Sequence, residues 1–119
     1  MPKRILVIED DSGYQELMRF VFSGYDLAVC GTVKEATEKI KAAPFDLIIS
    51  DINLGGPSGL DFLEDWGKEG LTEKVPLILW SSQNDPDTRQ KAADLGAAGF
   101  ITKPFNTEAV RKLVETLLK

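Results

Sequence analysis

The chain has 119 residues, 43% of them hydrophobic and 28% charged, which fits one globular domain with a hydrophobic core. Its formal net charge is −5 and its pI is near 4.7, and no cluster of lysine and arginine offsets this, which argues against binding to nucleic acids or anionic membranes. The absence of histidine excludes histidine ligands and bases, and the single cysteine excludes an internal disulfide. Together with the lack of a long apolar run or a signal-peptide pattern, this predicts a cytoplasmic protein.

The first part of the chain alternates between short apolar runs and segments with helical spacing. Residues 5–8 form a continuous apolar run that predicts a strand, and a helix is expected over residues 12–22, capped by Asp11 or Ser12. A second strand is expected at residues 27–30, and a second helix from a Thr32 cap to about residue 42. The inward face of the first helix is predicted to consist of Tyr14, Leu17, Met18, Val21 and Phe22.

The remainder of the chain repeats the same alternation three more times. Strands are expected at residues 47–50, 75–80 and 100–101, each followed by a helix, and Asp85 should cap the helix over residues 86–95. The last helix is expected over residues 107–118. Five strand–helix repeats predict a parallel sheet with helices on both faces, and we expect one domain over residues 1–119 without a separate output domain.

Polar side chains follow four of the five predicted strands. Glu9 and Asp10 come after the first strand, Asp51 follows the third, Ser81 follows the fourth and Lys103 follows the fifth. In such sheets, ligands bind at the carboxyl ends of the strands. Carboxylates that lie close together are costly unless a cation joins them, so this edge predicts a divalent-metal site that contains a reactive carboxylate. Each residue taken singly has a plainer interpretation, namely a helix cap, a turn or a solvated lysine.

In their order along the chain, four motifs resemble those of the receiver domain of bacterial two-component response regulators, and the resemblance covers the whole chain. They are Ile5-Leu6-Val7-Ile8-Glu9-Asp10-Asp11, Asp46-Leu47-Ile48-Ile49-Ser50-Asp51, Pro76-Leu77-Ile78-Leu79-Trp80-Ser81-Ser82 and Gly99-Phe100-Ile101-Thr102-Lys103-Pro104-Phe105. The resemblance implies an α/β, flavodoxin-like (βα)5 three-layer sandwich with strand order 2-1-3-4-5.

The resemblance also implies a role for each site residue. Asp51 would be the phosphoacceptor. Lys103 would be the invariant lysine, usually joined to Pro104 by a cis bond, while Ser81 would supply the switch hydroxyl and Phe100 the switch aromatic ring. Mg²⁺ would be held directly by Asp10 and Asp51, through water by Glu9, and by the backbone carbonyl of Asn53. These assignments suit the chemistry, because Mg²⁺ prefers oxygen ligands and phosphoryl transfer depends mainly on positioning and charge stabilisation.

The implied function is a switch rather than an enzyme with its own turnover. A phosphohistidine on a sensor histidine kinase or a histidine phosphotransfer protein would donate the phosphoryl group. The face made by the fourth helix, fifth strand and fifth helix would then change its affinity for a downstream effector.

The sequence departs from the family pattern at several positions. In the loop after Asp51, Gly55 and Ser58 stand where proline and aspartate are usual, and Gly55 should make this loop more mobile. Trp80 replaces the usual aliphatic residue before Ser81, where it either packs in the core or shapes the switch region. Phe20 falls off the apolar stripe of its helix and is predicted to be exposed.

Two other functions remain open at this point. Glu9 with Asp51-Ile52-Asn53 is similar to the acidic pattern of toprim enzymes, and an aspartate nucleophile also occurs in haloacid dehalogenase-like phosphatases, although Asn53 breaks both patterns. The first alternative is therefore a metal-dependent phosphoryl enzyme. The second is a degenerate receiver that serves only as a binding module.

Overall fold

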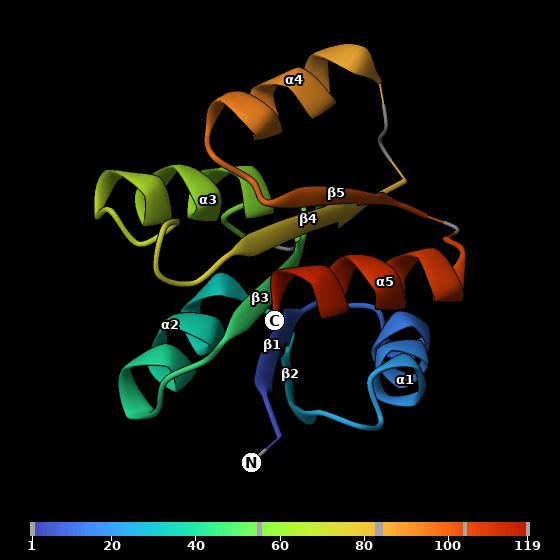
Figure 1. The fold of residues 1–119 in the computed structure, drawn as a ribbon. Helices are drawn as coiled ribbons and strands as arrows, with labels where there is room; N and C mark the ends of the chain where they lie inside the picture. The colour runs from blue at the N-terminus through green and yellow to red at the C-terminus, as the bar shows by residue number, and fades with distance from the viewer. Residues whose placement is uncertain (1, 55, 83–84, 104, 119) are drawn as a thin grey trace.

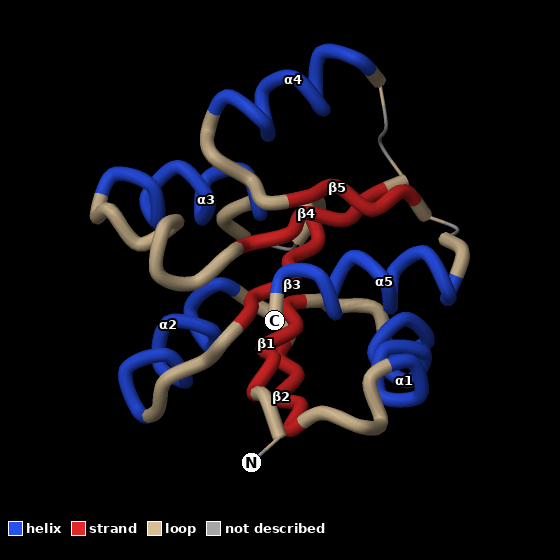
Figure 2. Tube along the Cα trace, viewed as in Figure 1, coloured by secondary structure: helices blue, strands red, loops and turns tan. Residues whose placement is uncertain are grey.

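A computed structural model, which describes residues 2–54, 56–82, 85–103 and 105–118, contains a five-stranded parallel sheet covered on both faces by helices (Figure 1; Figure 2). The order of the strands is β2-β1-β3-β4-β5, which confirms the predicted flavodoxin-like topology. The strands are β1 (Arg4–Ile8), β2 (Asp26–Cys30), β3 (Leu47–Asp51), β4 (Leu77–Ser81) and β5 (Gly99–Thr102).

Each helix follows one strand, and each begins at a side chain that accepts a hydrogen bond from the backbone of its first turn. The helices are α1 (Ser12–Val21), α2 (Val33–Ala42), α3 (Gly59–Lys68), α4 (Pro86–Asp94) and α5 (Thr107–Leu117). Asp11, rather than the alternative Ser12, caps α1, and the predicted caps Thr32 and Asp85 are confirmed. None of the helices in the described part of the chain is long and apolar enough to cross a bilayer.

The sheet separates two hydrophobic layers, as the alternation of side chains along a strand requires. Helices α1 and α5 cover one face, where Met18, Val114 and Trp80 are fully buried. Helices α2, α3 and α4 cover the other face, where Trp66 packs against Phe62 with ring centroids 5.6 Å apart. The two tryptophans of the chain therefore lie in different layers.

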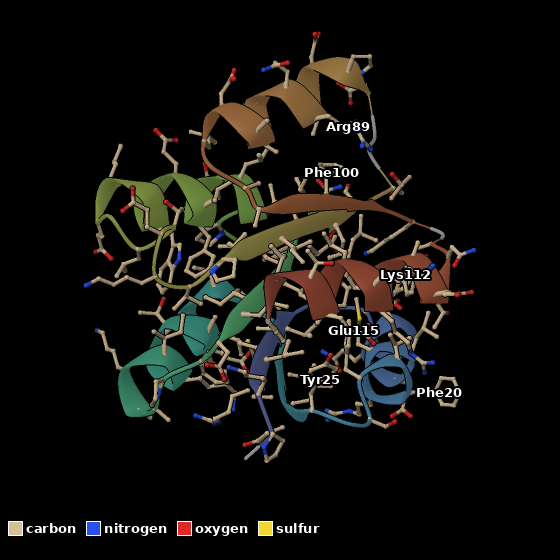
Figure 3. All side chains as sticks on the ribbon, viewed as in Figure 1. Phe20, Tyr25, Arg89, Phe100, Lys112 and Glu115 are labelled. Atoms are coloured by element: carbon tan, nitrogen blue, oxygen red, sulfur yellow. The ribbon has the colours of Figure 1, made fainter. Side chains whose placement is uncertain are left out.

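Two details of the sequence prediction are wrong. The fourth strand begins at Leu77 rather than at residue 75, because Pro76 has no N–H for the sheet and contributes only its carbonyl, which accepts from Ile48 N at 3.0 Å. Leu17 was predicted to face inward but is 38% exposed. At 100° per residue it lies at the edge of the stripe toward Phe20, which is 70% exposed as predicted and points away from the body of the molecule (Figure 3).

Candidate functional site

Three carboxylates meet at the carboxyl edge of the sheet. Strands β1 and β3 are neighbours with Ile8 opposite Ser50, so the residues that follow, Glu9 and Asp51, lie opposite each other. Oxygens of Glu9, Asp10 and Asp51 all lie within 4.8 Å of one another. Glu9 is fully buried and Asp51 is 5% exposed, whereas Asp10 is exposed to solvent.

Lys103 reaches into this cluster from the loop that follows β5. Its Nζ donates to Glu9 Oε1 at 2.9 Å and to Asp51 Oδ2 at 3.1 Å, and its side chain is only 9% exposed. The backbone sets its position, because Lys103 N donates to Ser81 O at 2.9 Å beyond the last residue of β5. The sheet thus brings together residues from the first, third and fifth strand–helix units.

This largely buried cluster contains three acidic groups and the ammonium group of Lys103. Burial raises the pKa of Glu9 to about 8, with a further rise from Asp51 that Lys103 only partly offsets. Burial lowers the pKa of Lys103, but the hydrogen bonds and charges of Glu9 and Asp51 outweigh it, and the net effect is a raised pKa. One ammonium group therefore does not fully compensate the acids around it.

The donor set fits a divalent cation. Glu9 Oε2 is buried and has no hydrogen-bond partner within the described part of the chain, which leaves an oxygen free for a ligand. Asp51 Oδ1 accepts from Asn53 N at 3.3 Å, so the backbone of the loop after β3 contacts the Asp51 carboxylate. Carboxylate and carbonyl oxygens are the ligands that Mg²⁺ prefers, and these residues could hold it together with water.

Gly59 packs against the backbone of Asp51 at the start of α3. A Cβ atom at this position would lie 2.1 Å from the Asp51 carbonyl oxygen and 3.0 Å from Ser50 Oγ, and Gly59 N donates to Ile52 O at 3.0 Å. Sequence reasoning gave Gly59 no role. The available signal was a glycine placed directly after the Ser58 cap, where the chain turns from the loop into the helix.

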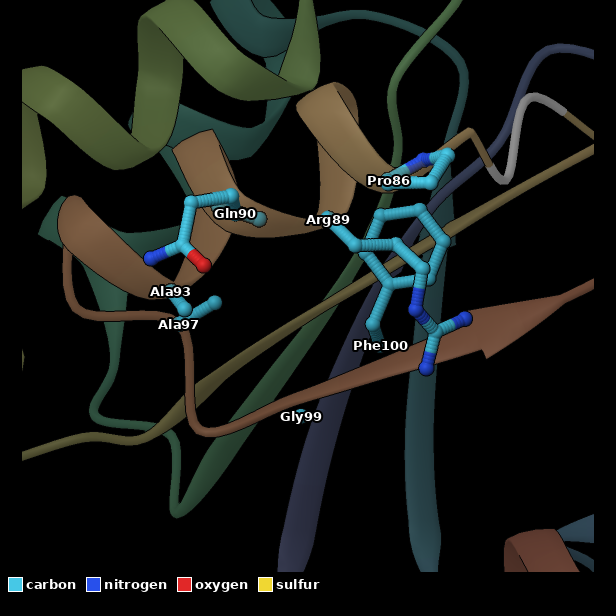
Figure 4. A pocket seen from close by; sticks show the side chains of 8 residues that line it. Pro86, Arg89, Gln90, Ala93, Ala97, Gly99 and Phe100 are labelled. Atoms are coloured by element: carbon cyan, nitrogen blue, oxygen red, sulfur yellow. The ribbon is translucent and has the colours of Figure 1, made fainter.

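The two predicted switch residues lie in different surroundings. Ser81 is buried at the end of β4, opposite Thr102 in the β4–β5 register. Phe100 is half-buried and lines a pocket of about 510 Å³ between α4 and β5 (Figure 4). Arg89 lies over the Phe100 ring at 5.0 Å and donates to Thr102 Oγ1 at 3.3 Å, so α4 contacts β5 through this arginine.

Two sequence predictions concern residues outside the described part of the chain. They are the cis bond to Pro104 and the mobility of the loop at Gly55.

The chain matches the family of the response regulator receiver domain over residues 5–115. It is 26% identical to the phosphate regulon transcriptional regulatory protein PhoB of Escherichia coli K12, over 100% of this chain and 53% of that protein. It is 30% identical to the transcriptional regulatory protein PmrA of Pectobacterium parmentieri, over 98% of this chain and 52% of that protein. The chain therefore spans about half the length of the curated relatives it matches.

Solved structures show the same similarity. The chemotaxis protein CheY4 of Vibrio cholerae superposes with a TM-score of 0.89 at 25% identity, over 99% of this chain and 100% of that one. A CheY-like receiver domain protein of Methanospirillum hungatei JF-1 superposes with a TM-score of 0.85 at 28% identity, over 98% of this chain and 94% of that one.

These likenesses define an α/β signalling domain. The chain belongs to the response regulator receiver domain family, as the sequence motifs indicated, and its function is that of a two-component response regulator receiver.

Proposed function

We propose that Asp51 accepts a phosphoryl group in a Mg²⁺-dependent reaction and that this modification switches the domain. The observation that supports this most strongly is the position of the Asp51 carboxylate, 3.1 Å from the Lys103 ammonium and within reach of two further acids. A carboxylate is already ionised and needs no general base, which suits a chain without histidine.

In the proposed reaction, an oxygen of Asp51 attacks phosphorus, forms the new P–O bond and displaces the imidazole nitrogen of a phosphohistidine on the partner. Lys103 stands beside Asp51 Oδ2, where its charge would stabilise the transferred group, and the Ser81 hydroxyl would donate to another phosphoryl oxygen. Mg²⁺, held by Glu9, Asp10, Asp51 and the carbonyl of Asn53, would neutralise charge on the acids and the phosphoryl group.

The signalling role follows from the change in charge. A phosphoryl group on Asp51 would draw Lys103 and Ser81 toward new partners, and Phe100 would repack on the face made by α4, β5 and α5. We propose that a sensor histidine kinase or a histidine phosphotransfer protein supplies the group, that a downstream protein or domain reads this face, and that the reaction takes place in the cytoplasm. The phosphoryl group can favour the active state only by as much as its contacts in that state are more favourable than its contacts in the inactive state.

The proposal is tested by incubating the chain with Mg²⁺ and acetyl phosphate and measuring the intact mass. We expect a gain of one phosphoryl group in the wild type, no gain in Asp51→Asn, and an undiminished gain in Asp65→Asn, which removes an exposed carboxylate on α3. An unmodified wild type, under conditions that label a known receiver, would rule out the proposal. Steady turnover of a phosphoester would instead support a phosphoryl enzyme.

A further inference from the structure

Two aromatic rings enclose the ammonium group of Lys103. Its Nζ lies 4.3 Å from the centroid of the Tyr14 ring and 4.4 Å from that of the Trp80 ring. The two rings meet edge to face, with centroids 5.1 Å apart and an interplanar angle of 83°. The ammonium therefore contacts both the carboxylates of Glu9 and Asp51 and the two aromatic rings.

The two rings come from elements far apart in the sequence. Tyr14 comes from α1 and Trp80 from β4, at the centre of the sheet. Trp80 is fully buried and also packs against Phe105, with ring centroids 5.6 Å apart. Because the Trp80 side chain cannot move without disturbing the core, the position of its indole ring beside Lys103 is fixed.

Core packing alone does not account for a tryptophan here. The Trp80 Nε1 is buried and has no hydrogen-bond partner within the described residues, and leaving such a donor unpaired is costly. An aliphatic side chain, or phenylalanine, would fill core space without this cost. What the indole adds is the aromatic face that attracts a cation most strongly, and that face meets Lys103.

We propose that Tyr14 and Trp80 are positioning residues that hold the Lys103 ammonium beside Asp51 for phosphoryl transfer. The proposal rests on the function proposed for Asp51. A lysine has a long stem with many rotamers, and its ammonium is strongly hydrated in water. The rings restrict the stem and exclude water from one side, so the charge is already in place when the phosphoryl group arrives.

The geometry is tested first, without Mg²⁺ or phosphate, by NMR of the Lys103 ε-CH₂ protons, assigned with Lys103→Arg. Ring currents should shift these protons upfield in the wild type. Trp80→Leu and Tyr14→Leu should each remove part of that shift. Trp66→Leu is the matched control, because it removes the other buried tryptophan from the opposite layer and should leave the Lys103 signals unchanged.

The role in transfer is tested by the rate of phosphorylation at saturating acetyl phosphate and Mg²⁺. We expect Trp80→Leu and Tyr14→Leu each to slow the reaction by about three- to ten-fold, as the loss of one cation–π contact implies. Trp80→Phe and Tyr14→Phe, which keep a ring, should restore most of the rate. Tyr14 is only half-buried on α1, so its variants provide the test if Trp80→Leu does not fold.

The failure of this proposal is distinct from the failure of the proposed function. A phosphorylated wild type with a Trp80→Leu rate no lower than that of Trp66→Leu, or with no rescue by Trp80→Phe, would overturn the positioning role alone. Lys103 protons without an upfield shift would also overturn it. A wild type that is never phosphorylated would overturn the function of Asp51 and the positioning role with it.

Discussion

Charged side chains gather at both ends of the parallel sheet, and the two groups differ in how fully their charges are compensated. At the amino end, Arg4 pairs with Asp26 at 3.1 Å, donates to Pro44 O at 2.7 Å and lies over the Phe45 ring at 4.5 Å. At the carboxyl end, three carboxylates lie close together, two of them buried, and Lys103 is the only cation in the described part of the chain that forms an ion pair with them, through Glu9 and Asp51. Charged side chains thus form a compensated ion pair at the amino end and a cluster with excess acidic groups at the carboxyl end.

The two ends differ in how their charged groups affect the free energy of unfolding. Partly exposed groups such as Arg4 and Asp26 keep their hydration, so their pairing changes the free energy of unfolding only slightly. Buried acids lose hydration and repel each other, so the carboxyl end costs stability unless a ligand compensates it. The function proposed for Asp51 would account for this cost, because the proposed cation and phosphoryl group need carboxylates close together. The following predictions test this contrast, beginning with the largest expected effect.

Gly59→Ala should be the most damaging single change near the acid cluster. The new Cβ would lie 2.1 Å from the Asp51 carbonyl oxygen, which is backbone and cannot move aside alone. We expect a loss of about 3 kcal/mol or more in the free energy of unfolding, measured with urea. Gly24→Ala, where no atom lies within 4 Å of the new Cβ, should change it by about 0.5 kcal/mol or less. Equal effects of the two variants would contradict the close packing of Gly59 on Asp51.

Mg²⁺ should stabilise the chain through the carboxyl end only. At a concentration one hundred times the Kd, it should add about 2.7 kcal/mol to the free energy of unfolding and raise the Tm. Asp10→Asn should lose most of this gain, because it removes one proposed ligand, whereas Asp26→Asn at the amino end should keep it. Without Mg²⁺, we expect Asp10→Asn to be more stable than the wild type by about 0.5 kcal/mol, because one like charge is gone. An undiminished Mg²⁺ response in Asp10→Asn would show that the cation binds elsewhere.

Much of the fold was predictable because local sequence patterns determine its strands and helices. The strand runs are apolar because both faces of the sheet are covered, and the caps at Asp11, Thr32 and Asp85 act within one turn of their own helices. The error at the start of β4 was avoidable, because the missing N–H of Pro76 is visible in the sequence, but the error at Leu17 lies where tertiary contacts decide the outcome. Whether Leu17 is covered depends on how widely the neighbouring elements extend over α1, which its spacing cannot tell.

The candidate site was predictable in its residue types and not in its surroundings. That Glu9, Asp51 and Lys103 lie at one edge follows from the parallel topology. Of the two interpretations of Trp80, packing in the core is confirmed, but its contact with Lys103 depends on which face of β4 it occupies and on Tyr14, which is distant in the sequence. The packing of Gly59 on Asp51 likewise requires the path of the loop between them.

Removal of Arg4 should cost stability without affecting the carboxyl end. Arg4→Met keeps an apolar stem but loses the ion pair, the bond to Pro44 O and the contact with the Phe45 ring. We expect a loss of about 1 kcal/mol in urea unfolding, with an unchanged response to Mg²⁺. Lys3→Met removes a neighbouring exposed cation and should cost less than about 0.5 kcal/mol. A change in Mg²⁺ affinity in Arg4→Met would mean that the two ends are coupled.

The smallest expected difference between the two ends is in how strongly salt weakens the coupling between their charged side chains. The coupling between Arg4 and Asp26, measured by a double-mutant cycle of Arg4→Met and Asp26→Asn, should be about 0.5 kcal/mol at low salt and should vanish near 1 M NaCl. These side chains are 33% and 55% exposed, so dissolved ions reach them. The cycle of Lys103→Met and Asp51→Asn should keep most of its coupling, because both side chains are less than one-tenth exposed. If both couplings vanished together, the carboxyl cluster would have to be open to solvent ions. The unpaired Glu9 oxygen would then be hydrated, and it would no longer support a place for Mg²⁺.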